Sequence, residues 1–380
     1  MLDVRTGLSV AGGRLSPWRG DDCCNWEGVE CHNITSHVVK LDHSNLDGST
    51  PNKSEHLDLS QGGFSGRIPH QLGNLSKLHH LALDNNGIEG TISETIVHLG
   101  NLHFLDLGLN NINGEIPESI GNLSKMPVLD LSSNRIFEAI LGTIGNLTAL
   151  QNLDLSGNQI IGQIPNSVGN LQQLEELSMS HNNIKWINSV IITAKVSQLL
   201  YSNNNLFGEI PEELTNLHGR HFLNSSWNHF SGNISDEIDL MSELESLDLS
   251  ENHLSGEIPL SISALYSLSI LNLSYNNLIG RIPMGTQLQT FTNLSYMGNP
   301  RLCGEPLQIK CPGDNPPIGV PEEEDMHEDD EYGGIWYFIG FALGFVFGFW
   351  VFMGIVMIKR NIRIKYIIHI DRICSWFMYM

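Results

Sequence analysis

Pairs of leucines separated by one residue recur with a period of 24 residues. The pairs run without a slip from Leu57/Leu59 to Leu177/Met179. After a shortened unit at Leu199/Tyr201, they resume from Leu223 to Leu273. Because side chains alternate along a strand, each pair predicts a short strand with two buried residues and solvent-facing neighbours. An Asn follows the second apolar residue by three positions in every unit but the first, which has Gly62: Asn86, Asn110, Asn134, Asn158, Asn182, Asn204, Asn228, Asn252 and Asn276.

This fixed self-similarity is the signature of a leucine-rich-repeat solenoid. One unit is too small to bury its own apolar face, so units must stack and share a core. We therefore predict an α/β solenoid, a right-handed arc of about eleven 24-residue coils. The Asn amide is expected to bond backbone groups of the buried bend that follows each strand. A recurrent Gly-x-Ile-Pro predicts a turn, and "GNLxxL" predicts a helical or 3₁₀ convex side.

The chain changes character after the repeats. An uncharged run of 24 residues, Ile335 to Ile358, is long enough to span a bilayer as a helix. Basic residues follow it, which places the C-terminus in the cytoplasm and the repeats outside. The expected organisation is an N-terminal cap at 1–40, a repeat array at 41–290, a C-terminal cap at 291–312, an acidic stalk at 313–334, the membrane helix at 335–358 and a basic tail at 359–380.

Composition narrows the function. The net charge of −22 disfavours nucleic acid and suits a basic partner, although acidity also serves solubility. The sequence contains no Gly-rich phosphate loop, G-x-S-x-G or H-E-x-x-H motif, so we expect no enzyme activity, catalytic residue, cofactor or metal site. An extracellular array fits the sequons at Asn33, Asn52, Asn74, Asn122, Asn146, Asn224, Asn233, Asn272 and Asn293. It also fits cysteines gathered at both array ends, where short disulfide loops can close caps.

Both ends of the array resemble the plant leucine-rich-repeat receptor-like proteins. The opening "GRLSPWRGDDCCNWEGVECHNITSHVVKLD" is similar to their N-terminal cap, and "GNPRLCGEPLQIKC" is similar to their C-terminal cap. The closest resemblance is to the kinase-less receptors that perceive fungal ethylene-inducing xylanase. The resemblance implies disulfides Cys24–Cys31 and Cys303–Cys311, with Cys23 left unpaired. It also implies a single-pass type I plasma-membrane protein that signals through a separate receptor kinase.

Four departures from that family bear on function. Residues 1–20 lack the apolar core of a signal peptide, so we expect a truncated N-terminal cap. An upstream cap cysteine of the family is absent. The first coil, at Leu41, precedes Leu57 by only 16 residues. Finally, Lys185 to Gln198 stands where relatives carry a long non-repeat island, and the coils are fewer than in most relatives.

Two surfaces are candidates for binding partners. Gly340, Gly344 and Gly348 form a small-residue ridge that would let the membrane helix pack against that of a receptor kinase; the alternative is a ridge that faces lipid. Solvent-facing strand positions on the concave side form the candidate ligand surface, although scattered surface aromatics are ordinary. They are His79, His80, His103, Phe104, His181, Trp227 and Tyr275, with Leu109, Glu175, Glu176 and His221 also on this side.

The predicted function is a cell-surface receptor-like protein that binds an extracellular protein or peptide, in plant defence, and signals through an associated kinase. One alternative is a truncated decoy that occupies the co-receptor without sensing a ligand. Another is a binding module that resembles the secreted inhibitors of polygalacturonases, against which the predicted membrane span argues.

Overall fold

The computed structural model describes residues 8–10, 29–31, 38–42, 56–187, 196–216, 221–285 and 287–314. Contacts divide the chain into two units, residues 1–314 and 315–380. The predicted stalk, membrane helix and tail lie almost wholly in the second unit and outside the described residues. Within the described residues, no helix is both long and apolar enough to cross a membrane.

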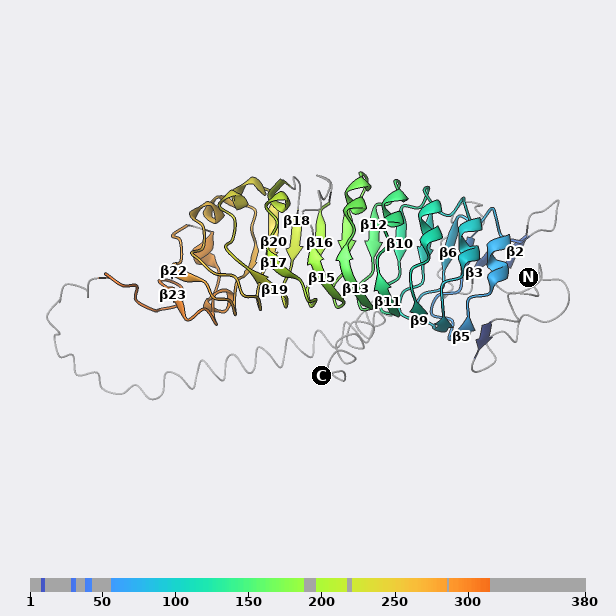
Figure 1. Ribbon diagram of the computed structural model, residues 1–380, viewed down its shortest axis with the longest axis horizontal. Helices are drawn as coiled ribbons and strands as arrows, with labels where there is room; N and C mark the ends of the chain where they lie inside the picture. Colours follow the sequence, from blue (N-terminus) through green and yellow to red (C-terminus); the bar gives the residue numbers. More distant parts are fainter. Residues whose placement is uncertain are drawn as a thin grey trace, which may run out of the picture. The chain divides into compact units, whose positions relative to one another are not determined.

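Successive coils stack in chain order, as the colour sequence of the labelled strands shows (Figure 1). Their first strands form one twelve-stranded sheet, here called the long sheet, which is parallel from β3 onward. Leu41 pairs with Leu57 in register although the first coil is short. The strands are β2 (Val29–Cys31), β3 (Val38–Asp42), β4 (His56–Asp58), β6 (His80–Ala82), β8 (Phe104–Asp106), β10 (Val128–Asp130), β12 (Asn152–Asp154), β14 (Glu176–Ser178), β16 (Gln198–Leu200), β18 (His221–Asn224), β20 (Leu244–Asp248) and β21 (Ile270–Asn272).

The Gly-x-Ile-Pro segments, and the equivalent segments of other coils, build a second set of strands where the sequence predicts only turns. Six of these strands and the N-terminal β1, which pairs antiparallel to β5, form the short sheet, which ends at β15, next to the segment that interrupts the repeat period. Four more form two separate pairs, β17 with β19 and β22 with β23. These strands are β1 (Leu8–Val10), β5 (Phe64–Arg67), β7 (Gly87–Gly90), β9 (Asn111–Gly114), β11 (Arg135–Ala139), β13 (Gln159–Ile164), β15 (Asn183–Ile187), β17 (Phe207–Glu209), β19 (His229–Ser231), β22 (Ile279–Arg281) and β23 (Arg301–Cys303).

The "GNLxxL" segments form short 3₁₀ helices, and every helix among the described residues is of this type. The predicted α/β solenoid is therefore, in this part of the chain, a solenoid of strands and 3₁₀ turns. The helices are η2 (His70–Asn74), η3 (Glu94–His98), η4 (Glu118–Asn122), η5 (Gly142–Asn146), η6 (Asn166–Asn170), η7 (Glu212–Asn216), η8 (Asp236–Leu240), η9 (Leu260–Ala264), η10 (Leu288–Thr290) and η11 (Asn293–Ser295).

The predicted Asn side chains form a continuous hydrogen-bonded ladder beside the leucine core. Asn110, buried like most of the series, is typical. Its Oδ1 accepts from the Ile88 amide of the preceding coil at 3.0 Å. Its Nδ2 donates to the carbonyls of Leu83, Leu107 and Gly108 at 2.9, 3.1 and 3.0 Å. The role predicted for the Asn is confirmed, and Asn299 extends the ladder by one more coil.

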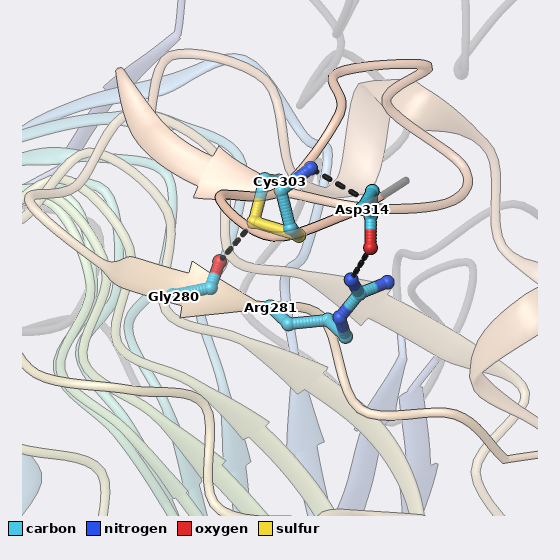
Figure 2. Close-up of a disulfide and its surroundings, with 5 residues drawn as sticks. Gly280, Arg281, Cys303 and Asp314 are labelled. Carbon is cyan, nitrogen blue, oxygen red and sulfur yellow. Dashed lines mark hydrogen bonds and ion pairs between the residues drawn. A yellow bond between two sulfur atoms is a disulfide. The ribbon is translucent and has the colours of Figure 1, made fainter. Parts of the chain in front are cut away.

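The C-terminal end is closed by the expected disulfide between Cys303 and Cys311, whose Cα atoms lie 5.0 Å apart. Figure 2 shows Cys303 on β23, with its Sγ 3.4 Å from the Gly280 carbonyl oxygen of β22. Asp314 accepts a hydrogen bond from the Cys311 amide at 2.9 Å and forms an ion pair with Arg281. The disulfide thus closes a loop within the cap, and the pairing of β23 with β22 and the Arg281–Asp314 ion pair hold the cap against the last coil.

Candidate ligand-binding face

Two rows of side chains cover the solvent-facing side of the long sheet, because each strand contributes its first and third residue to the same face. Strand register places them in line. The first row is His56, His80, Phe104, Val128, Asn152, Glu176, Gln198, Phe222, Ser246 and Ile270. The second row is Asp58, Ala82, Asp106, Asp130, Asp154, Ser178, Leu200, Asn224, Asp248 and Asn272. Except for the buried Ala82, every member is half-buried or exposed.

Aromatic rings stack across three adjacent coils of this face, those of β4, β6 and β8. The His56 and His80 ring centroids are 3.8 Å apart with planes 16° apart, and those of His80 and Phe104 are 4.2 Å apart with planes at 8°. His79 and His103, one residue earlier, form a looser stack at 5.3 Å. The structure therefore brings together four of the predicted ligand-surface residues, His79, His80, His103 and Phe104.

The Asp residues of the second row have a structural role. Oδ1 of Asp58 accepts from the Ser60 amide and hydroxyl at 2.9 and 2.6 Å. Equivalent bonds to the amide two residues later are made by Asp106, Asp130, Asp154 and Asp248, and by the amide oxygens of Asn224 and Asn272. Such local bonds stabilise the turn that follows the strand. The repeated Asp of these coils is therefore explained by the fold.

The carboxylates of neighbouring coils are close enough to repel one another. Burial, and then the charge of Asp58, raises the pKa of Asp84 to about 6. Burial raises the pKa of Asp106 to about 7; the Gly108 amide opposes that shift, and the charges of Asp130, Asp84 and Asp58 add to it. This end of the face therefore gains negative charge as pH rises from acidic to neutral.

Stability is expected to decrease across the same pH interval. A carboxyl group whose pKa is higher in the folded than in the unfolded chain stabilises the fold fully below pH 4, and this contribution is lost as pH rises through 6 to 7. Urea unfolding at pH 5 and pH 8 should show the decrease, and Asp106→Asn should make it smaller while still accepting from Gly108. Glu243→Gln, which removes an exposed carboxylate, is the control. An identical decrease in wild type and Asp106→Asn would contradict the expectation.

A shallow groove of about 240 Å³ lies further along the face, over β10, β12, β14 and β16. Its polar lining comes from Asp130, Asn152, Asp154, Glu176 and Gln198. Asn152 Nδ2 donates to Glu176 Oε2 at 2.6 Å, which links two adjacent coils. The groove is acidic and follows the direction in which strands succeed one another, so it fits an extended chain with basic or amide groups.

Five predicted ligand-surface residues lie outside the strands, and their assignment to strand positions is wrong: His79 and His103 each precede a strand by one residue, and His181, Trp227 and Tyr275 lie in turns. His181, Trp227 and Tyr275, like Leu109, each immediately precede a ladder Asn and adopt a positive φ of 53° to 56°. The ladder Asn fixes this left-handed turn in each coil, whatever side chain precedes it. Trp227 and Tyr275 are 60% and 46% exposed, as expected of surface residues. Burial lowers the pKa of His181, which disfavours its charged form.

The sequons fall into two groups. Asn74, Asn122 and Asn146 are exposed at the ends of 3₁₀ helices, Asn293 is exposed at the start of η11, and Asn233 is exposed between β19 and η8. Asn224 and Asn272 are half-buried in the second row, where each accepts hydrogen bonds from a Ser side chain. A glycan at either position would cover the candidate face. Asn33 and Asn52 lie outside the described residues, as do Cys23, Cys24 and the ridge Gly340, Gly344 and Gly348. Only the backbone of Cys31 is described.

Sequence reasoning missed His56 and Ala82 as members of this face, and it did not group Asp58 with the histidines. The signal was present, since His56 precedes His80 by one repeat period, and Asp58 shares a strand face with His56. Comparing residues at equivalent positions of successive coils, rather than residues of one type, would have placed them together.

Comparisons with known proteins agree with this fold. The family described as "Leucine rich repeat" matches residues 76–136 and 124–184, with further repeat matches at 243–265 and 267–288. The family described as "Leucine rich repeat N-terminal domain" matches residues 1–32. A plant ice-binding protein shares the architecture, with 29% identity, a TM-score of 0.67, and coverage of 83% of this chain and 96% of that one.

Receptors are also among the relatives. The Arabidopsis receptor kinase HAESA, solved with the peptide hormone IDA and the co-receptor SERK1, is 31% identical with a TM-score of 0.65; the match covers 76% of this chain and 47% of that one. The tomato receptor-like proteins EIX2 and EIX1 are 38% and 34% identical over 96 and 99 residues. Each match takes in 24% of this chain but only 9% of the tomato protein. With its solenoid, its caps and these similarities, the chain is a leucine-rich-repeat protein that is similar to the plant receptor-like proteins, with distant similarity to EIX1 and EIX2 over about a quarter of its length.

Proposed function

We propose that the chain is a cell-surface receptor-like protein whose long-sheet face binds an extracellular peptide or protein. The observation that carries the proposal is the two-row face itself, with an aromatic stack at one end, an acidic groove in the middle and exposed Phe222 and Ile270 beyond. Apolar anchors beside oriented polar groups are the usual composition of a peptide-binding surface. The HAESA complex, a relative with a bound peptide hormone, supports the same use of the fold.

The charge of the face specifies the ligand class further. Five Asp residues lie in the second row and Glu176 lies in the first, so a ligand rich in Lys or Arg gains favourable electrostatic interactions. Apolar ligand side chains would contact Phe104 and Phe222. A basic peptide with one or two apolar anchors is the ligand that this surface fits.

A library of random peptides panned against the full chain tests this proposal. We expect enriched peptides to carry basic residues, and Phe222→Asp on β18 to weaken their binding at least tenfold. Phe137→Asp is the matched control, because Phe137 is 45% exposed, against 37% for Phe222, but lies on β11 of the short sheet. Equal loss of binding in both variants, or enrichment of acidic peptides, would reject the long-sheet face as the site.

Signalling would require a partner, and we propose a receptor kinase held through the predicted membrane helix 335–358. HAESA was solved with a co-receptor, SERK1, which supports a two-component arrangement among relatives. Co-precipitation of a receptor kinase by wild type, and its loss in a Gly340/Gly344/Gly348→Leu variant, is the expected result. Kinase association without peptide-dependent signalling would favour the decoy; full association in the Leu variant would exclude the glycine ridge as the contact.

A further inference from the structure

We propose that His56, Asp58 and His80 form a binding site for a zinc ion on the long-sheet face. His56 and Asp58 are two residues apart on β4 and therefore share one side of the sheet. His80 on β6 is the direct register partner of His56. The ligand atoms of all three residues lie within 4.8 Å of one another, and each side chain is half-buried. Among the described residues, no other group of three His, Cys, Asp or Glu side chains gathers in this way.

The donor set selects the class of metal. Two imidazole nitrogens and one carboxylate oxygen are typical zinc ligands, whereas calcium and magnesium prefer oxygen alone. Three protein ligands leave a fourth position of a tetrahedral site open to water or to a ligand group. Because this position faces solvent on the peptide-binding side of the sheet, the ion is accessible to a bound partner.

The surroundings of Asp58 favour a cation. The Ser60 amide and hydroxyl both donate to Asp58 Oδ1, which fixes the carboxylate in one orientation, as bonds outside the ligand shell commonly do in metal sites. Beside Asp58 in the second row, the next strand carries Ala82, where most other strands carry a larger polar residue. The small side chain leaves room for an ion. Asp84, whose charge interacts with that of Asp58, adds to the negative potential.

His56, His80 and Phe104 stack in the structure. Stacked imidazoles direct their nitrogens within parallel planes, so binding requires the two rings to turn until a nitrogen of each faces the ion. The χ2 torsion of His is broad, and such turning needs no backbone movement. Zinc would therefore break the contact between His80 and Phe104 and expose the Phe104 ring, which couples the ion to the apolar part of the face.

The test is calorimetric titration of the full chain, without a histidine tag, with ZnCl₂. We expect one ion per chain at micromolar affinity, weakened at least tenfold by His80→Ala and by Asp58→Asn. Asp58→Asn retains an oxygen that accepts from Ser60, so it keeps the local fold while weakening the ligand. Cobalt(II) in place of zinc should give the visible absorption of a tetrahedral nitrogen–oxygen site in wild type only.

His253→Ala is the matched control. His229 and His253 are both exposed and also stack across adjacent coils, with ring centroids 5.5 Å apart and planes at 18°, but no carboxylate completes a cluster there. This variant should bind zinc as wild type does. Equal zinc affinity in wild type, His80→Ala and Asp58→Asn, with thermal unfolding showing all three folded, would overturn the proposal; so would an equal loss in His253→Ala.

Discussion

Replacing Asn110 with Ala should lower the free energy of unfolding by about 3–5 kcal/mol. The side chain makes four hydrogen bonds to backbone groups, of which one donor and one acceptor belong to the preceding coil. Ala leaves the Ile88 amide and three carbonyls without that partner in a buried bend. Each unpaired buried group costs about 1–3 kcal/mol, and water entry with local relaxation recovers part of the total.

Asn111→Ala is the control for this substitution. Asn111 is the adjacent residue in sequence but is exposed on β9, so its truncation should change stability by less than about 0.5 kcal/mol. Urea unfolding measures both variants, and hydrogen exchange should show faster exchange of the Ile88 amide in Asn110→Ala alone. Similar stabilities of the two variants would mean that water, rather than the Asn amide, satisfies the bend in solution.

Gly145→Ala should destabilise the array by about 2 kcal/mol through a clash between neighbouring coils. A Cβ on Gly145 would lie 2.3 Å from the carbonyl oxygen of Ser167 in the next 3₁₀ helix, and backbone cannot move aside as a flexible side chain can. Gly73 and Gly121 meet the next coil in the same way, at 2.3 and 2.4 Å from a backbone oxygen. The glycine of "GNLxxL" therefore sets how closely the coils stack.

Gly142→Ala, in the same helix, separates this clash from the general effect of removing a glycine. Its Cβ would meet nothing closer than the Ser167 hydroxyl at 3.7 Å, an ordinary contact. The lower backbone entropy of the unfolded chain should then stabilise the variant slightly, by about 0.4–1 kcal/mol. Thermal unfolding of both variants tests the pair; comparable destabilisation by both would show that coil spacing is not the cause.

The long sheet and the Asn ladder could be predicted because each is written as a residue type at a fixed spacing, and the family resemblance implied the cap disulfide. The short sheet could not. Its strands β7, β9 and β11 each bury a single Ile (Ile88, Ile112 and Ile136), and their other residues are exposed or half-buried, so they lack the repeated alternation that marks a strand. Pairing with the neighbouring coil, a tertiary contact, makes them strands.

The candidate site was only half predictable for a related reason. Composition identified exposed aromatics and histidines, but contact between them depends on register across coils. His80 meets His56 and Phe104 because their strands align, whereas Trp227 and Tyr275 are placed by a left-handed turn before the ladder Asn, which their own residue types do not signal. Leu, Trp and Tyr are unusual at positive φ, and propensity alone argues against the conformation that the Asn imposes.

Each ladder Asn bonds only to its own coil and to the coil before it. The Asn hydrogen bonds between coils therefore join nearest neighbours alone. Deletion or duplication of a whole 24-residue repeat would restore the same contacts between neighbouring coils, and no Asn side chain would lose its hydrogen-bond partners. The spacing from Asn182 to Asn204 is two residues shorter than the norm, yet Asn204 still accepts from Ile184 and donates to the Met179 carbonyl. Recombination can thus change the number of repeats without compensating substitutions where the coils meet. Receptors with arrays of very different length can therefore arise from one repeat.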